Sequence, residues 1–180
     1  MELTEMTCQT PMGQLMEFLP SAKRALFAKY HLGGCSSCAF SNDESLADLC
    51  QRSQLDADEV LAHLIASHHH DEALWMTPER AHELQTELRW IDTRTREEHE
   101  AVVIAGSDFL TNELQQQIFA SSKETMILLY DHSGKTVLDQ VAWFRGHGLE
   151  NTFGLRGGID AWSREIDHTL PRYRLEIDAQ

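Results

Sequence analysis

One short loop in the second half of the chain has the sequence of an anion-binding site. Met126–Tyr130 is an apolar run typical of a buried strand, and the polar segment 131–136 after it leads into a predicted helix ending near Gly146. A loop between a strand and a helix directs several backbone N–H groups at one point, where they can bind an anion. The first residue of this loop is Asp131. Its carboxylate is a weak nucleophile that cannot carry sulfur as a thiolate can.

The second candidate for chemistry is the CxxC sequence of Cys35 and Cys38. Two cysteines at this spacing bring their sulfurs within reach of one metal ion or of one another. The sequence identifies no cofactor and leaves three interpretations open: redox or sulfur-carrier thiols, ligands of a metal ion or an iron–sulfur cluster, and thiols that only pack the loop. A metal site would need further ligands, which Cys50, His31 or a second subunit could supply.

The composition limits the kinds of partner. Hydrophobic residues make up 42% of the chain and charged residues 24%, as in globular proteins. The net charge of −14, from 29 acidic and 15 basic residues, lacks the basic footprint of a duplex-binding protein and disfavours anionic membranes. Met1–Glu5 lacks the basic and apolar regions of a signal peptide, and all four cysteines lie in the first 50 residues. We therefore expect a cytoplasmic protein with a protein partner and no nucleic acid or membrane partner, and a homo-oligomer stays open.

The elements before residue 70 are predicted to be all-helical. Apolar residues recur at the 3- and 4-residue spacing of amphipathic helices, and residues that can cap a helix precede each run. The predicted helices are 22–30 after Ser21, with Ala25, Leu26 and Phe27 on its apolar face, one from Asn42 or Asp43 through Cys50, and one opened by Asp56. His68–Glu72 is predicted to be a polar linker, so we expect a small helical CxxC domain at residues 1–70.

Strands and helices alternate in the rest of the chain. After a helix at 78–87, strands are predicted at 89–92, 107–110, 126–130 and 151–154, and helices at 95–99, 111–120, 136–146 and 158–165. This alternation indicates a mostly parallel sheet with helices on both faces. We therefore predict an α/β domain at residues 74–180, preceded by the small all-α domain.

The α/β part resembles the rhodanese-like family from about Trp90 to Trp162. Trp90–His99 resembles the family's first signature, a strand that ends in Asp-x-Arg, here Asp92 and Arg94. Ile104–Thr111 is similar to the family's Ile-Pro-Gly stretch without its prolines, and Leu155–Trp162 matches the closing Leu-x-Gly-Gly-x-x-x-Trp motif. The resemblance implies the family's α/β fold, with an active loop of the type Cys-x-x-Gly-x-Arg at 131–136.

The loop departs from the family pattern at two positions. Asp131 replaces the sulfur-carrying cysteine and Thr136 replaces the final arginine, whereas Gly134 is retained. The family's sulfurtransferase activity is therefore not carried over, and we assign no catalytic residue in this degenerate loop, which consists of Asp131, His132, Ser133, Gly134, Lys135 and Thr136. The carboxylate should fill the anion site from within and mimic a thiolate electrostatically. The loop is then either a decayed active site or a recognition surface.

The first part of the chain carries a second resemblance. Gln14–Ala66 resembles a small helical domain of undefined function, which is also similar to the amino-terminal region of iron–sulfur repair proteins, through Tyr30–Cys38 and Leu55–Leu61. This implies a link to thiol or iron–sulfur biology. We predict an inactive rhodanese-like protein that acts as a binding or regulatory module in sulfur or iron–sulfur metabolism. The alternative is an enzyme in which Cys35 or Cys38 is the sulfur carrier or redox nucleophile.

Overall fold

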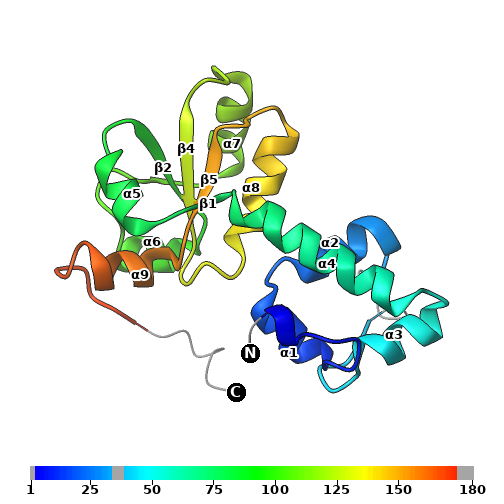
Figure 1. The fold of residues 1–180 in the computed structure, drawn as a ribbon. Coiled ribbons are helices and arrows are strands. Elements are labelled where there is room, and N and C mark those ends of the chain that lie inside the picture. The colour runs from blue at the N-terminus through cyan, green and yellow to red at the C-terminus, as the bar shows by residue number, and fades with distance from the viewer. Residues whose placement is uncertain (1–2, 34–38, 174–180) are drawn as a thin grey trace. The chain divides into compact units, whose positions relative to one another are not determined.

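The computed structural model describes residues 3–33 and 39–173 (Figure 1). The chain divides into two compact units, Met1–Ala73 and Leu74–Gln180. Cys35 and Cys38 lie outside the described residues, so the CxxC prediction stays a prediction. No helix in the described ranges combines the length and the apolar character needed to cross a membrane.

The first unit is helical, as predicted. It contains a short 3-10 helix, Leu3–Glu5, and the helices α1 (Met12–Phe18), α2 (Ala22–Tyr30), α3 (Leu46–Ser53) and α4 (Ala57–Glu72). One cluster of buried side chains forms its core, including Leu15, Leu26, Leu49, Val60 and Leu64. These residues recur at helical spacing along each element, so every helix turns one apolar face to the same core.

The cap of α3 differs from the prediction. The Ser45 hydroxyl, and not Asn42 or Asp43, accepts the N–H of Asp48, at 3.1 Å. The segment before Ser45 instead bonds to the start of α1. The carbonyl of Asn42 accepts the N–H of Gly13 and that of Glu44 accepts the N–H of Met12, which gives partners to N–H groups that have none inside the helix. The predicted cap of α4 is confirmed, since Asp56 accepts the N–H of Glu59 at 2.9 Å.

Two further predictions in this unit were wrong. His68–Glu72 is the last part of α4 and no linker, and Asp71 in it is buried and paired with Arg24 at 2.7 Å. This contact between α4 and α2 keeps a polar turn helical. Phe27 is 51% exposed, because the buried stripe of α2 runs through Ala22, Ala25 and Leu26 and Phe27 follows about 100° around the helix.

The second unit is built on a five-stranded parallel sheet. Its strands are β1 (Trp75–Met76), β2 (Leu88–Asp92), β3 (Asp108–Phe109), β4 (Met126–Tyr130) and β5 (Thr152–Leu155), in the spatial order β1-β5-β4-β2-β3. The central pair runs in register from Leu88 beside Met126 to Asp92 beside Tyr130. The parallel sheet is therefore confirmed, whereas β1 was not predicted because two residues show no periodicity.

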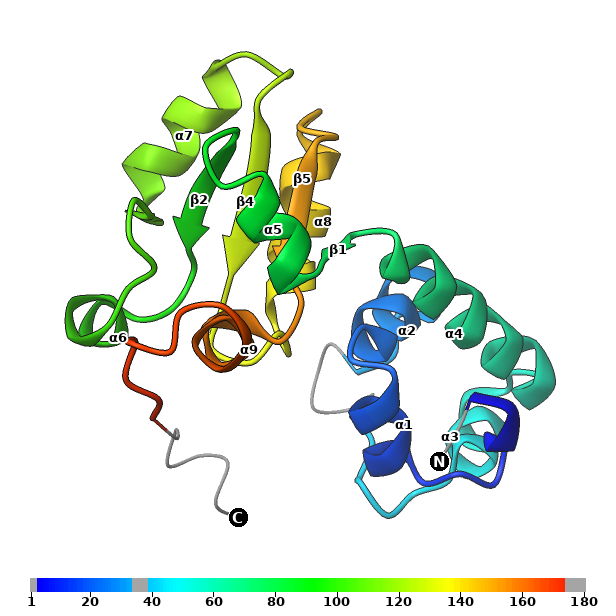
Figure 2. The same ribbon diagram turned by 60° about the vertical axis from the view of Figure 1, so that its left-hand side comes forward.

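Helices cover both faces of this sheet (Figure 2). They are α5 (Pro78–Glu83), α6 (Arg96–Ala101), α7 (Asn112–Ala120), α8 (Val137–Gly146) and α9 (Gly158–Glu165). Successive residues of β4 point to opposite faces: Leu128 and Tyr130 pack with α5 and α9, and Ile127 and Leu129 pack with α7 and α8. Both faces are therefore buried, as expected for parallel sheets.

Candidate functional site

The carboxyl ends of neighbouring strands bring the candidate residues to one edge of the sheet. β2 ends at Asp92 and the adjacent strand β4 ends at Tyr130, so that Asp92 is the last residue of one strand and Asp131 directly follows the other. Open parallel sheets bind ligands at this edge. The loop 131–136 and the segment after Asp92 are thus in the place where a site is expected.

The loop closes around its own carboxylate. Asp131 is only 6% exposed, and its Oδ1 accepts the N–H of Gly134. Its Oδ2 accepts the N–H of Thr136 at 2.8 Å, the Thr136 hydroxyl at 2.8 Å and the N–H of Val137 at 3.0 Å. These donors come from the loop and the first turn of α8, where N–H groups have no partner inside the helix. The donors that could bind an external anion are therefore engaged by Asp131.

Glycines join this loop to the start of α9. Gly158 has a φ of +60°, and a Cβ on it would lie 2.5 Å from the carbonyl oxygen of Asp131. That carbonyl accepts the N–H of Ile159 at 3.0 Å, and the carbonyl of His132 accepts the N–H of Asp160 at 3.1 Å. The Gly-Gly pair of the closing motif thus allows α9 to approach the loop backbone, because a residue with a Cβ would clash there.

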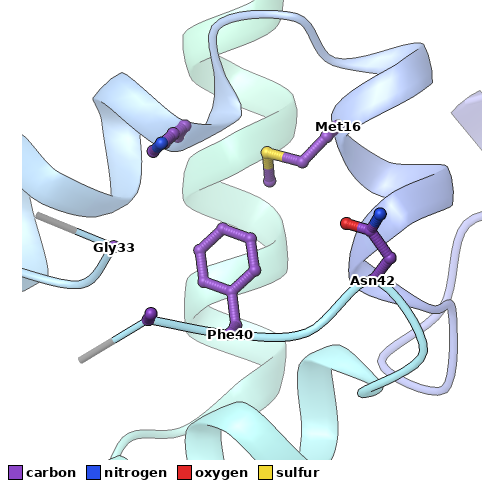
Figure 3. Close-up of a pocket in the computed structure, with 6 residues that line it drawn as sticks. Met16, Gly33, Phe40 and Asn42 are labelled. Carbon is purple, nitrogen blue, oxygen red and sulfur yellow. The ribbon is translucent and has the colours of Figure 1, made fainter. Parts of the chain in front are cut away.

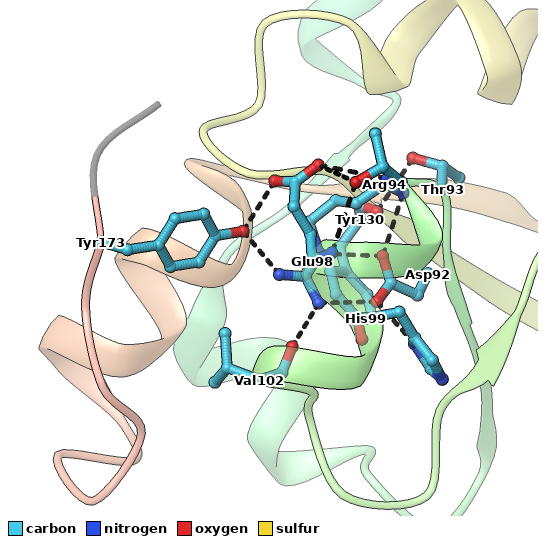
Figure 4. A network of polar contacts seen from close by, with 9 residues as sticks. Asp92, Thr93, Arg94, Glu98, His99, Val102, Tyr130 and Tyr173 are labelled. Carbon is cyan, nitrogen blue, oxygen red and sulfur yellow. Dashed lines mark hydrogen bonds and ion pairs between the residues drawn. The ribbon is translucent and has the colours of Figure 1, made fainter. Parts of the chain in front are cut away.

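A buried ion pair supports the same edge of the sheet (Figure 4). Arg94 donates from Nε to Asp92 Oδ1 at 2.9 Å and from Nη2 to Asp92 Oδ2 at 2.6 Å, and both side chains are at most 1% exposed. Burial by itself would raise the pKa of Asp92, but hydrogen bonds from Arg94 and His99 and the charge of Arg94 outweigh it and lower the pKa. Two bonds from one guanidinium fix the pair in place, as expected for a structural role.

Tyr173 was not singled out from the sequence, although it contacts this network. Its hydroxyl accepts from Arg94 Nη1 at 2.7 Å and donates to Glu98 Oε1 at 2.7 Å. Its ring lies 4.5 Å from the ring of His132 in the loop. Burial, followed by the bond to Glu98, raises the pKa of Tyr173 to about 12, so the hydroxyl keeps its proton. The residues around it have no helical or strand period that could have predicted the contact.

The two described cysteines are poor candidates for thiolate chemistry. Burial, a hydrogen bond from its Sγ to Asp58 Oδ1 at 3.2 Å and the charge of that carboxylate raise the pKa of Cys8 to about 11. Burial and the charge of Asp56 raise the pKa of Cys50. His31 is exposed at the end of α2. In residues 3–33 and 39–173 no three His, Cys, Asp or Glu side chains are grouped to hold a metal ion, so a site with Cys50 or His31 depends on Cys35 and Cys38.

A pocket of about 260 Å³ lies in the helical unit (Figure 3). Its walls carry apolar and polar side chains, and its lining residues are Met16, Lys23, Gly33, Ala39, Phe40 and Asn42. Gly33 and Ala39 are the described residues on either side of the CxxC segment. The mixture of an aromatic ring, an ammonium group and an amide suits a small molecule with both apolar and anionic parts.

Comparison with known proteins identifies the second unit. The sequence profile of the rhodanese-like domain matches residues 77–165. A rhodanese-related protein from Thermoplasma volcanium is 21% identical, over 51% of this chain and 91% of that one, with a TM-score of 0.45. A rhodanese-like domain protein from Staphylococcus aureus is 16% identical, over 56% of this chain and 98% of that one, with a TM-score of 0.44. The chain matches no curated protein. The alternating elements, the closing Gly-Gly motif and the matched profile together make residues 77–165 a rhodanese-like domain.

Proposed function

We propose that the chain is a cytoplasmic rhodanese-like protein without sulfurtransferase activity, which acts as a binding or regulatory module in sulfur or iron–sulfur metabolism. One observation carries the proposal: the Asp131 carboxylate accepts the N–H groups of Gly134, Thr136 and Val137. Sulfur transfer through this loop would need a thiolate that forms a persulfide, and a carboxylate forms no such intermediate. The carboxylate also occupies the donors that would stabilise a bound anion.

The retained architecture of the loop supports a binding role. Its backbone is held against α9 by the carbonyls of Asp131 and His132, and the buried pair of Asp92 and Arg94 lies beside it. An ordered loop at the carboxyl edge of a sheet can present a fixed surface to a partner without performing chemistry. The link to sulfur or iron–sulfur metabolism rests on the sequence resemblance of Gln14–Ala66, and the expected partner is a protein.

Thiosulfate:cyanide sulfur transfer by the purified full chain tests the proposal. We expect no turnover by the wild type. In Asp131→Cys the new thiol would receive the same N–H donors, which should lower its pKa. Its thiolate should then attack the outer sulfur of thiosulfate and release sulfite, which leaves a persulfide that mass spectrometry detects. Asp131→Ser is the matched control, because its hydroxyl fits the loop and cannot carry sulfur. Wild-type turnover that is lost in Cys35→Ser would contradict the proposal.

The pocket lined by Gly33 and Ala39 favours a second candidate function, an enzyme that uses Cys35 or Cys38 as sulfur carrier or redox nucleophile. Gly33 and Ala39 line this pocket. In the sequence, Cys35 is two positions after Gly33, and Cys38 directly precedes Ala39. A small substrate bound there would contact residues that lie within two sequence positions of Cys35 or Cys38, the candidate sulfur-carrying or redox-active cysteines. Metal analysis and an absorption spectrum of anaerobically purified protein separate the interpretations. Bound iron or zinc would indicate ligation by Cys35 and Cys38. A metal-free protein in which the thiols of Cys35 and Cys38 titrate freely would exclude ligation and leave the sulfur-carrier and redox roles.

A further inference from the structure

The last described residues of the chain pack against the rhodanese-like domain, and Tyr173 among them joins the polar network of Arg94 and Glu98 (Figure 4). We define the tail groove by the five side chains that hold this segment, which are Arg94, Glu98, His132, Asp160 and Ser163. They come from the segment after β2, from α6, from the loop 131–136 and from α9. The groove therefore borders the loop that the proposed function assigns to binding.

One end of the tail groove recognises a phenolic hydroxyl. Arg94 is buried, and three of its hydrogen bonds go to Asp92 and to the carbonyl of Val102. Its Nη1 donates to the hydroxyl of Tyr173, which in turn donates to Glu98. A hydroxyl group is suited to this position because it can accept from the guanidinium and donate to the carboxylate at the same time. The His132 ring packs against the aromatic face.

The rest of the groove recognises a basic residue and the peptide backbone. Asp160 accepts two bonds from Arg172, from Nε at 2.8 Å and from Nη2 at 3.1 Å. This is the bidentate geometry that distinguishes arginine from other cations. The buried Ser163 hydroxyl donates to the carbonyl of Leu170 at 2.7 Å, and the Leu170 side chain packs on the core that contains Trp162. The contacts thus specify an apolar residue, then after one intervening residue a basic residue and a tyrosine.

The chain's own tail does not satisfy the groove completely. Among the described residues, His132 Nδ1 is buried and has no hydrogen-bond partner. A cavity of about 10 Å³ remains where His132, Asp160 and the tail meet, at the lower limit of the space that one water molecule needs. A segment that placed a polar group near His132 Nδ1 would make a contact that the tail lacks. Two carboxylates in the groove and a net charge of −14 also favour a basic ligand over an acidic one.

We propose that the tail groove is a docking site for a segment of a protein partner with the pattern apolar-x-basic-Tyr. Pro171–Tyr173 of the same chain fills the site until such a segment displaces it. The inference rests on the proposed role as a binding module and specifies its surface and the chemistry of its partner. Recognition joins contacts to three side chains, those of Leu170, Arg172 and Tyr173, with one backbone hydrogen bond, and peptide-recognition sites likewise combine the two kinds of contact.

Peptide binding tests this proposal. It is measured on the full chain after substitutions in Arg172 and Tyr173 have weakened the hold of the tail groove on the chain's own tail. The probe is a fluorescein-labelled peptide amide with the sequence of residues 169–173, Thr-Leu-Pro-Arg-Tyr, followed by fluorescence anisotropy. The double variant Arg172→Ala/Tyr173→Ala should bind it at least about tenfold more tightly than the wild type, because an attached tail competes at a local concentration in the millimolar range. Arg172→Ala alone removes only the exposed pair with Asp160, so it provides a milder release if the double variant fails to fold.

Matched changes in the peptide and in the protein distinguish specific docking from non-specific binding. A probe with Phe in place of Tyr, and the added substitutions Asp160→Asn or Glu98→Gln, should each weaken binding several-fold. Equal affinity for the wild type and the released variants, absence of saturable binding, or insensitivity to Asp160→Asn and Glu98→Gln would overturn the proposal. Sulfur transfer is measured in a separate assay. A protein that shows neither sulfur transfer nor peptide binding would contradict only the docking site. A protein that transfers sulfur and binds the peptide would contradict only the proposed function.

Discussion

The Asp131 carboxylate accepts the backbone N–H of Val137 at 3.0 Å and thereby joins the end of β4 to the first turn of α8. Two further N–H groups and the Thr136 hydroxyl converge on the same side chain. A bound anion normally fills such a ring of donors, and here a residue of the chain does so. This relationship predicts how the domain responds when the carboxylate is removed.

Asp131→Ala should destabilise the rhodanese-like domain by roughly 2–3 kcal/mol, because buried donors lose a charged partner. All four tryptophans, Trp75, Trp90, Trp143 and Trp162, lie in this unit, so urea unfolding followed by tryptophan fluorescence measures it selectively. Added sulfate should raise the stability of the variant more than that of the wild type, since the vacated donors can bind an anion. The exposed Glu150→Ala is the control, and an equal response to sulfate would contradict an open anion site.

Gly158→Ala tests the close approach of α9 to the loop. A Cβ at Gly158 would lie 2.5 Å from the Asp131 carbonyl oxygen, and the residue has a φ of +60°. We expect a loss of at least about 2 kcal/mol in the same unfolding experiment, from the clash and the left-handed conformation together. Gly146→Ala at the end of α8 is the matched control, because no atom lies within 4 Å of its added Cβ. A loss as large in the control would show that the effect is not local.

The sequence predicted the α/β domain well because its elements are regular. The helix expected at 158–165 is α9, and the strand expected at 126–130 is β4. Burial against the sheet or the core requires apolar residues at regular spacing in these elements, and this spacing is visible in the local sequence. β1 escaped prediction because Trp75 and Met76 form a strand only through their register with Gly154 and Leu155, far along the chain.

The candidate site was predictable only in its local part. The donors around Asp131 follow from a strand, a loop and a helix that are consecutive in sequence. The contact of Tyr173 with Arg94 spans 79 positions, and no local pattern at either residue specifies the other. His68–Glu72 was misassigned for the same reason, because the pair of Asp71 with Arg24 keeps this polar stretch helical.

Ser45→Ala should destabilise the helical unit by about 1 kcal/mol, because it removes the side-chain cap of α3. Asp43→Ala should change stability by less than about 0.5 kcal/mol, as an exposed residue outside the cap. Far-UV circular dichroism during urea unfolding follows the helices of both units. Tryptophan fluorescence reports the second unit alone, so a change seen only by circular dichroism belongs to the helical unit. A larger loss of stability in Asp43→Ala than in Ser45→Ala would indicate that Asp43 caps α3.

Acid should weaken the rhodanese-like domain through Asp92. Since the pKa of Asp92 is lowered in the folded protein from an ordinary value of 3.8, its contribution to stability is complete above that value and is lost as the pH falls through the folded-state pKa. The unfolding free energy, measured by tryptophan fluorescence between pH 6 and pH 2, should therefore decline below about pH 4. Asp92→Asn should flatten this decline, and a slope as steep as that of the wild type would place the acid sensitivity in other carboxyl groups.

Cys8 should react slowly with iodoacetamide at pH 8. Its pKa is raised from 9.0 to about 11, first by burial and then by Asp58, which lowers the thiolate fraction about 100-fold. A thiolate of higher pKa is also a better nucleophile, by about tenfold for this difference, so the net rate should fall about tenfold relative to an unperturbed thiol. Peptide mass spectrometry after timed alkylation resolves Cys8 from the other cysteines. Asp58→Asn removes the charge of the hydrogen-bond acceptor while keeping its shape, and should raise the rate at Cys8. If Cys8 reacts like a free thiol in the wild type, the contact between Sγ and Asp58 is not maintained in solution, and Cys8 joins Cys35 and Cys38 as a candidate for thiol chemistry.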